Sequence, residues 1–164
     1  FPGHGESDGT PGFLPSAEKL LSWALRLWCH ATEQHPGINA FLCGTSMGGA
    51  VCINLSRQLH PQRLGSPLAP SGAILLAPMV RISRVPPTWQ VMLLTALSKI
   101  APEWALISTN ASDPAENYAD ADRRAREMAQ EKYTGKVRLR TGLTVQTTAR
   151  AVEENLAAVT VPML

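Results

Sequence analysis

Residues 44–48, with the sequence GTSMG, have the G-x-S-x-G spacing that can hold a serine hydroxyl at a sharp turn. Such a serine can attack an acyl carbon when a base removes its proton. The pentapeptide alone is a weak pattern, so the residues around it decide its meaning. The apolar run at 40–43 predicts a buried strand before the motif, and the residues after it predict a helix. We therefore interpret the stretch as a strand–turn–helix that projects Ser46 from the end of a strand.

Three glycines and one backbone amide complete this candidate site. Gly44, Gly48 and Gly49 lack a Cβ atom, and we expect this to let the strand and the helix approach closely around the turn. The N-terminus of the helix places a positive dipole beneath Ser46. The amide N–H of Met47 can donate to the oxyanion that attack on a carbonyl creates. Phosphate binding is disfavoured, because neither GxxxxGK[ST] nor a dinucleotide-binding fingerprint is present.

The surrounding pattern alternates strands with helices. Strands are predicted at 38–43, 72–77 and 159–164, and helices from Ser16 to before Pro36, from the turn to about residue 59, and at 89–100, 120–132 and 143–158. No strand is expected between residues 79 and 142. The apolar residues of the first two strands run consecutively, which is typical of parallel strands covered on both faces. The sequence thus predicts an α/β fold with a helical insertion.

Composition excludes several classes of protein. The chain has 164 residues, of which 45% are hydrophobic and 17% charged, and a formal net charge of +2. These values argue against global disorder and against binding nucleic acid through a dense basic face. The three cysteines match no zinc or redox spacing. No apolar run approaches the roughly 20 residues that span a bilayer, so we expect a cytoplasmic or peripherally membrane-associated protein with no targeting segment in this chain.

Four stretches make the chain resemble a known family, namely PGHGESDG at 2–9, FLCGTSMGGA at 41–50, the apolar strand at 72–78, and the run at 138–162. Together they resemble the α/β-hydrolase fold, and within it the monoglyceride lipase and lysophospholipase group of serine hydrolases (serine aminopeptidase S33-like). The resemblance implies a partial hydrolase fold and suggests an internal fragment of such a protein. It also implies a core with the nucleophile elbow at 1–78, a helical cap or lid at 79–142, and a return helix with the start of the next core strand at 143–164.

The resemblance implies a carboxylic ester hydrolase that acts on monoacylglycerol- or lysophospholipid-like substrates through an acyl-enzyme, without cofactor or metal. In this family the catalytic Asp and His follow the serine in chain order, so both are expected outside these residues. None of the four histidines, His4, His30, His35 and His60, stands where that base is expected. A short-chain esterase, a thioesterase or a peptidase on the same scaffold stays open. So does a truncated or degenerate hydrolase without activity that serves as a binding or interaction module.

The predicted cap contains candidates for contact with lipid. Its first helix carries large apolar side chains at helical spacing: Trp89, Met92, Leu93 and Leu97. They either line a path for an acyl chain and touch lipid, or simply pack on the domain. Seven cations follow: Arg123, Arg124, Arg126, Lys132, Lys136, Arg138 and Arg140. These suit an anionic membrane surface or an ordinary solvated face. We expect a lipid or small ester as the substrate, with peripheral membrane contact through the cap and no nucleic-acid partner.

Overall fold

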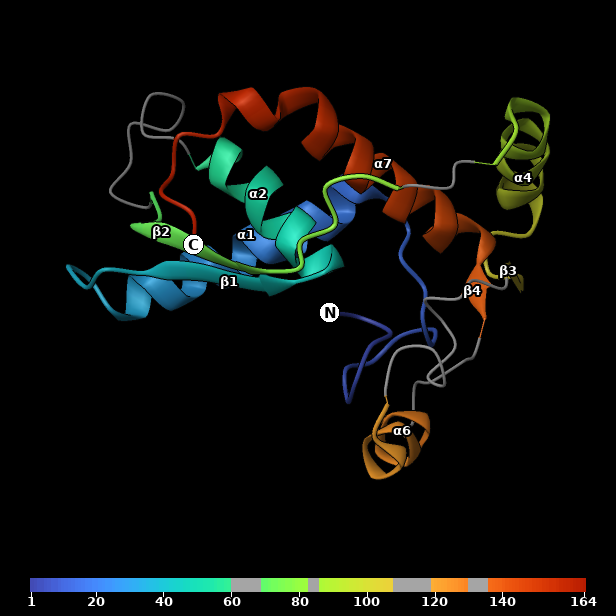
Figure 1. Cartoon of the computed structure of the whole chain (residues 1–164), viewed down its shortest axis with the longest axis horizontal. Coiled ribbons are helices and arrows are strands. Elements are labelled where there is room, and N and C mark those ends of the chain that lie inside the picture. Colours follow the sequence, from blue (N-terminus) through green and yellow to red (C-terminus); the bar gives the residue numbers. More distant parts are fainter. Residues whose placement is uncertain (60–68, 83–85, 108–118, 130–135) are drawn as a thin grey trace. The chain divides into compact units, whose positions relative to one another are not determined.

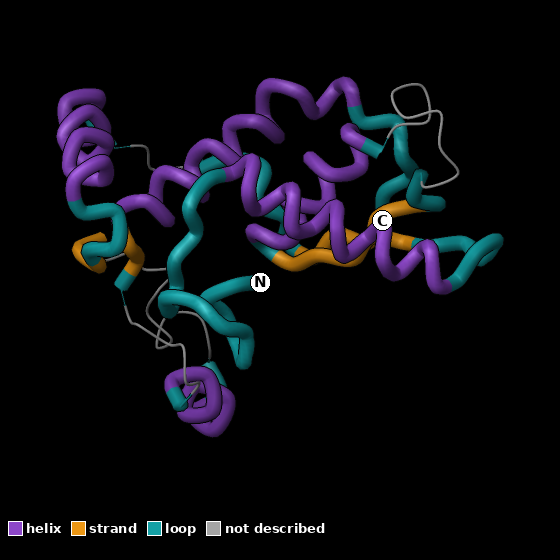
Figure 2. The backbone as a smooth tube through the Cα atoms, turned by 180° about the vertical axis from the view of Figure 1, so that it is seen from behind, coloured by secondary structure: helices purple, strands orange, loops and turns teal. Residues whose placement is uncertain are grey.

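The structure, a computed structural model, describes residues 1–59, 69–82, 86–107, 119–129 and 136–164 (Figures 1 and 2). The helices are α1 Ala17–Gln34, α2 Met47–Gln58, α4 Thr88–Ile100, α6 Ala121–Met128 and α7 Leu139–Asn155, and the strands are β1 Phe41–Thr45, β2 Gly72–Leu76, β3 Ala105–Ile107 and β4 Val137–Arg138. The chain forms two compact units, one of Phe1–Ser16 with Pro86–Thr144 and one of Ala17–Val85 with Val145–Leu164. The division into core, cap and return segment at residues 78 and 142 stays a prediction.

A parallel sheet forms the centre of the second unit. β1 pairs with β2 in parallel, in a register that runs from Phe41 opposite Gly72 to Thr45 opposite Leu76. On the other edge of β2, Met163 forms a parallel bridge with Ala73. This bridge confirms that a third strand begins near the end of the chain. β1 starts later than predicted and continues through Thr45, because the first part of the glycine motif pairs with the end of β2.

Helix α2 is the centre of the core. Its residues from Gly49 to Ser56 are all buried, on every side of the helix. Ala50 and Ile53 pack with Val152 of α7, and side chains from β2 and the segment after it pack against them. Asn54 ties the two helices together, because its side-chain amide donates to the carbonyl of Thr148 at 3.1 Å. Figure 1 shows α2 between the two strands and the C-terminal part of α7. These packing contacts therefore hold helix α2, which Ser46 directly precedes, against the rest of the unit.

The two faces of the sheet differ in burial. Leu42 and Ala73 lie on the face that α2 covers and are 7% and 2% exposed. On the opposite face Phe41 and Leu76 are 56% and 55% exposed, and Cys43 is exposed as well. The predicted cover on both faces is therefore wrong for the part of the chain that the structure describes. A continuous apolar run shows that both faces of a strand can be buried. Whether both faces are buried depends on other segments of the protein that pack against them.

The first unit contains a small antiparallel pair that the sequence did not predict. β3 pairs with β4 within the stretch in which no strand was expected. The strands have three and two residues, too few to produce a periodic pattern. Helix α4 begins and ends within a residue of the prediction, whereas α7 begins at Leu139, earlier than predicted. The predicted end of α6 lies outside the described residues.

The first loop is tied to the start of α7 within this unit. The Thr141 hydroxyl donates to the carbonyl of Gly12 at 2.8 Å and accepts from the N–H of Leu14 at 2.9 Å. The Thr144 hydroxyl donates to the carbonyl of Leu14 at 3.0 Å. The Arg138 guanidinium donates to two further carbonyls, those of Pro11 and Glu103. These bonds satisfy backbone groups of a loop that has no regular structure of its own.

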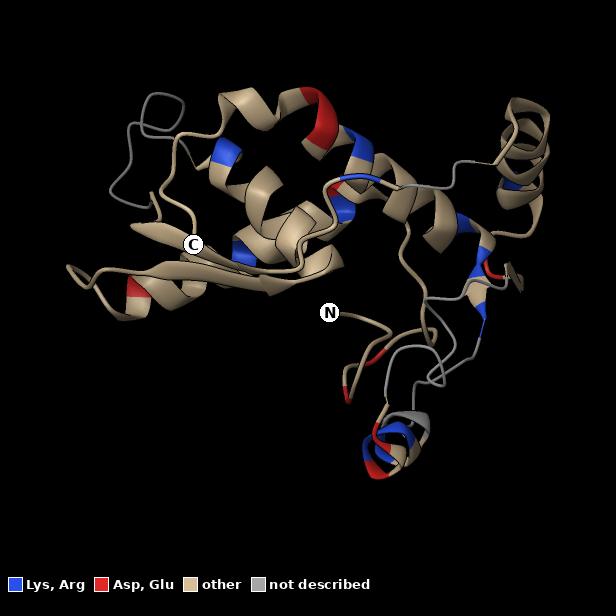
Figure 3. Ribbon diagram, viewed as in Figure 1, with Lys and Arg blue, Asp and Glu red and all other residues tan. Residues whose placement is uncertain are grey.

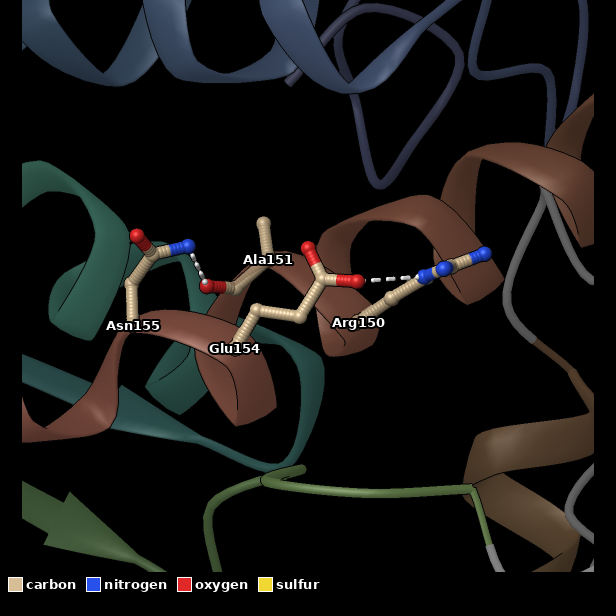
Figure 4. A network of polar contacts seen from close by, with 4 residues as sticks. All are labelled: Arg150, Ala151, Glu154 and Asn155. Carbon is tan, nitrogen blue, oxygen red and sulfur yellow. Dashed lines mark hydrogen bonds and ion pairs between the residues drawn. The ribbon is translucent and has the colours of Figure 1, made fainter.

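The C-terminal part of α7 carries polar contacts between its own residues (Figure 4). The Arg150 Nε atom donates to the Glu154 carboxylate at 2.6 Å, and Asn155 donates to the carbonyl of Ala151 at 2.9 Å. The bond to Glu154 raises the pKa of the Arg150 guanidinium. Both charged side chains are largely exposed, so water screens their attraction and the pair contributes little to stability. None of the helices that the structure describes is long and apolar enough to span a membrane.

Candidate active site at the end of β1

Ser46 joins the last residue of β1 to the first residue of α2. Its backbone has φ 51° and ψ −116°, a conformation that side-chain-bearing residues rarely adopt. Such a conformation costs about 1–3 kcal/mol and persists only where the surroundings hold it. The Ser46 side chain is exposed and makes no capping hydrogen bond to α2. The local fold therefore presents a hydroxyl at the carboxyl end of a parallel strand, at the cost of backbone strain.

The backbone of Ser46 is held by the last residue of β2 and the segment that follows it. The Ser46 N–H donates to the carbonyl of Leu76 at 3.0 Å, and its carbonyl accepts from the N–H of Met79 at 2.9 Å. The same carbonyl also accepts the helical bond from Ala50 at 3.2 Å. Both polar backbone atoms of the strained residue are thus satisfied. Sequence reasoning missed the role of this segment, since it treated Pro78 only as the end of a strand.

Two of the three glycines are sterically required. A Cβ atom on Gly44 would lie 2.5 Å from the carbonyl carbon and oxygen of Gly48, and one on Gly49 would lie 2.7 Å from Cβ of Pro78. Real Cβ atoms essentially never come this close to other atoms. A Cβ on Gly48 would meet no described atom within 4 Å, so the steric reason expected for Gly48 is not found. Its backbone, rather than a missing side chain, makes the close contact with Gly44.

Met47 is the first residue of α2. The first N–H groups of a helix have no hydrogen-bond partner within the helix, and they lie at the positive end of the helix dipole. The N–H of Met47 therefore belongs to the group of donors that suit an anion next to Ser46. α2 has no acidic residue in its first turn, so no carboxylate on its own residues competes for that position.

Two cysteines flank the turn and differ in exposure. Cys43 on β1 is exposed, and Cys52 on α2 is buried. Burial, with a smaller contribution from Cys43, raises the pKa of the Cys52 thiol. Cys52 therefore stays protonated and packs as a small apolar side chain.

The histidines make local contacts. His30 on α1 lies 3.1 Å from the side-chain amide of Gln34, and the His35 backbone N–H donates to Thr32. Nδ1 of His4 lies 3.1 Å from the carbonyl of Pro2 in the first loop, and His60 falls outside the described residues. Among the described residues no group of three His, Cys, Asp or Glu side chains could hold a metal ion.

Helix α4, in the other unit, turns its apolar side chains outward. Trp89, Met92 and Leu93 are 63%, 68% and 51% exposed, whereas Leu97 is half-buried. The opposite side of the helix carries Ser98, which is fully buried. This arrangement is the reverse of an ordinary surface helix, which buries its apolar stripe.

Comparison with known proteins identifies the family. The family model described as serine aminopeptidase, S33 (Hydrolase_4) matches residues 1–164. The chain belongs to this family. Caffeoylshikimate esterase of Arabidopsis thaliana, an S33 relative in sequence, is 27% identical over 171 residues, which cover 98% of this chain and 48% of that protein. The chain therefore spans about half the length of this relative.

Solved structures show that this S33-family chain has part of an α/β-hydrolase fold. The monoacylglycerol lipase of Paleococcus ferrophilus matches with a TM-score of 0.75 and 21% identity, over 99% of this chain and 58% of that one. A soluble variant of monoglyceride lipase from Saccharomyces cerevisiae, solved with a substrate analog, matches with a TM-score of 0.60 and 18% identity, over 93% of this chain and 49% of that one. The parallel strands with α2 and α7 are the part of that fold that carries Ser46.

Proposed function

We propose that the natural protein that carries this chain hydrolyses carboxylic esters and that Ser46 is its nucleophile. The observation that supports this most directly is the backbone of Ser46, which is strained, fully hydrogen-bonded and exposed at the carboxyl end of β1. Strain of this kind concentrates at functional sites, and ligands of open α/β sheets bind at the carboxyl ends of the strands. Membership of a hydrolase family agrees with the proposal.

In the proposed reaction, the Ser46 Oγ forms a bond to the carbonyl carbon of the ester while a histidine takes its proton. The N–H of Met47 donates to the resulting oxyanion, aided by the positive end of the α2 dipole. When the tetrahedral intermediate collapses, the bond to the alcohol breaks and the histidine protonates the departing alcohol. Water then hydrolyses the acyl-enzyme in the same way and releases the acid. We propose that this histidine and its orienting aspartate lie outside residues 1–164, in the chain order of the family.

For the substrate we propose a monoacylglycerol- or lysophospholipid-like ester. The exposed apolar stripe of α4 supports this, because a long acyl chain needs an apolar surface. The two solved neighbours are lipases whose descriptions name monoacylglycerol or monoglyceride. We also propose that α4 touches membranes peripherally. Its one charged residue is Lys99, and Figure 3 shows a mainly uncharged ribbon there, whereas α6 carries several charges.

A fluorophosphonate probe tests the proposed nucleophile. The natural protein should react at Ser46, as mapped by peptide mass spectrometry, and Ser46→Ala should abolish the labelling. Ser71→Ala is the matched control, because Ser71 is also exposed but lies at the amino end of β2. Absence of labelling in a folded, wild-type protein would contradict the proposal and favour a degenerate hydrolase that only binds.

A substrate panel tests the finer proposal. Monooleoylglycerol and oleoyl lysophosphatidylcholine should be cleaved with a higher kcat/KM than p-nitrophenyl acetate or an alanine p-nitroanilide. Preference for the anilide would instead support a peptidase, which the family description names. Replacing Trp89 and Met92 by Ser should weaken binding to phosphatidylcholine vesicles, whereas kcat for the soluble acetate should stay unchanged. Equal vesicle binding by both proteins would count against membrane contact through α4.

A further inference from the structure

Within the described part of the chain, Ala77 is the second non-glycine residue with a strained backbone. Its φ is 43°, and it and Ser46 are the non-glycine residues with positive φ among those described. Thr45 and Leu76 are register partners in the parallel pair, so Ser46 and Ala77 occupy the next position on neighbouring strands. Two rare conformations therefore stand side by side at the same edge of the sheet. The family resemblance and the motif account only for the one at Ser46.

Nothing in the local sequence favours this conformation at Ala77. Alanine has a Cβ atom that disfavours positive φ, and the following Pro78 normally pushes the residue before it towards an extended backbone. An extended Ala77 would carry the chain straight on beyond β2. The bend at Ala77 instead turns the chain so that the N–H of Met79 reaches the carbonyl of Ser46 at 2.9 Å.

Three further contacts keep this bend in place. The carbonyl of Leu76, just before it, accepts from the N–H of Ser46 at 3.0 Å. Pro78 lies directly over Gly49 in the first turn of α2, where a glycine Cβ would be 2.7 Å from its own Cβ. Met79 then packs against the core cluster of Ala50, Ile53 and Val152. Two hydrogen bonds therefore link the backbone of Ser46 to residues on either side of Ala77, namely Leu76 and Met79.

We infer that Ala77 is a positioning residue for Ser46, and that the turn from Leu76 to Met79 braces the strained serine in its reactive geometry. This rests on the proposed function of Ser46. Ala77 touches no reacting group. It acts by directing two backbone groups, the carbonyl of Leu76 and the N–H of Met79, onto Ser46. A strained residue stays in place only while its surroundings hold it, so loosening this turn releases Ser46.

The test loosens the turn without adding bulk. Ala77→Gly accepts φ 43° but also many other conformations. In the natural protein we expect the fluorophosphonate labelling rate to fall about tenfold, because small misplacements of reacting groups are costly. We expect kcat to fall with KM unchanged, and the backbone amide of Ser46 to exchange with deuterium about tenfold faster. The melting temperature should stay close to that of the wild type.

Two variants separate positioning from general loosening. Ala40→Gly makes the same change at the opposite end of β1, where Ala40 accepts a bond from Ser71, and should leave labelling and exchange unchanged. Ala77→Asn should recover most of the rate, because asparagine adopts positive φ readily and is stiffer than glycine. If Ala77→Gly does not fold, Met79→Ala serves instead. It keeps the N–H that donates to Ser46 but removes the side chain that packs against the core cluster, so it should slow labelling in the same direction.

Unchanged labelling and unchanged exchange of Ser46 in a folded Ala77→Gly or Met79→Ala protein would overturn the inference. Slow labelling that Ala40→Gly reproduces would also overturn it, since the effect would then be a general one. If the wild-type protein does not react with the probe, the proposed function fails. In that case the exchange of the Ser46 amide still decides whether the turn braces this residue.

Discussion

Replacing Gly44 by alanine should distort the turn that carries Ser46, for a purely steric reason. The φ angle of Gly44 is not positive, so the backbone conformation at this position would not strain an alanine. The added Cβ would lie 2.5 Å from the carbonyl carbon and oxygen of Gly48, against about 3.4 Å for an ordinary contact, an overlap of about 0.9 Å. Both atoms belong to the backbone at the start of α2, so they can yield only if the helix moves.

The expected loss in the free energy of unfolding is about 3 kcal/mol, at the upper end of the ~1–3 kcal/mol that overpacking usually costs. The matched control is Gly48→Ala, the same change four residues later. A Cβ there meets no described atom within 4 Å, and alanine is preferred to glycine in helices by up to about 1 kcal/mol. The control should therefore be as stable as the wild type or slightly more stable.

Urea titrations followed by circular dichroism measure both changes, and the fluorophosphonate labelling rate measures the effect on the site. Gly44→Ala should lower the urea midpoint and slow labelling, because α2 must shift away from β1 and carry the backbone of Ser46 with it. Equal midpoints for the two variants would refute the steric argument. A lower midpoint with normal labelling would show that the close contact stabilises the fold without orienting the serine.

Four further predictions concern other parts of the chain. Thr141→Val should lower stability by about 1–3 kcal/mol in urea titrations, because it leaves the buried N–H of Leu14 and the half-buried carbonyl of Gly12 without the hydroxyl that they share. Thr147→Val, on the exposed side of α7, should cause no such loss, and equal losses for the two variants would contradict this reasoning. Gly142→Ala should change stability by less than about 1 kcal/mol. The added Cβ would clash only with the flexible end of the Ile107 side chain, at 2.6 Å, and would make an ordinary contact with Val137 at 3.9 Å. A large loss would show that the Ile107 side chain cannot move. Iodoacetamide should label Cys43 in the native protein and Cys52 only after unfolding. Burial raises the pKa of the Cys52 thiol, so the folded state keeps a proton that the unfolded state releases above about pH 8.5. The free energy of unfolding should therefore fall as the pH rises beyond that value. Cys52→Ala should remove this part of the fall.

Local signals explain which elements could be predicted. Helix α1 begins directly after Ser16 and ends before Pro36, where the sequence places a cap and a stop. β2 and α4 match their predicted ranges within a residue. β3 and β4 could not be predicted, because a pair of strands this short is defined by its partner and not by its own pattern.

The candidate site was predictable only in part. The spacing around Ser46 indicated its turn, since strand, glycines and helix are adjacent in sequence. The brace from Ala77 to Met79 is about 30 residues further along the chain, and only the parallel pairing of β1 with β2 brings it to Ser46. An Ala-Pro pair after a strand predicts an extended backbone, which is the opposite of the observed bend.

By itself, the amino-acid sequence determined where the chain turns and which hydroxyl stands at the turn, because backbone preferences act over a few neighbouring residues. The tertiary structure alone decided which glycines have no room for a side chain, Gly44 and Gly49 but not Gly48, because each clash involves atoms from another residue's backbone or another segment. It also decided that α4 buries Ser98 and exposes Trp89. A helical pattern defines a stripe of apolar residues, but the neighbouring elements determine which side of the helix they cover.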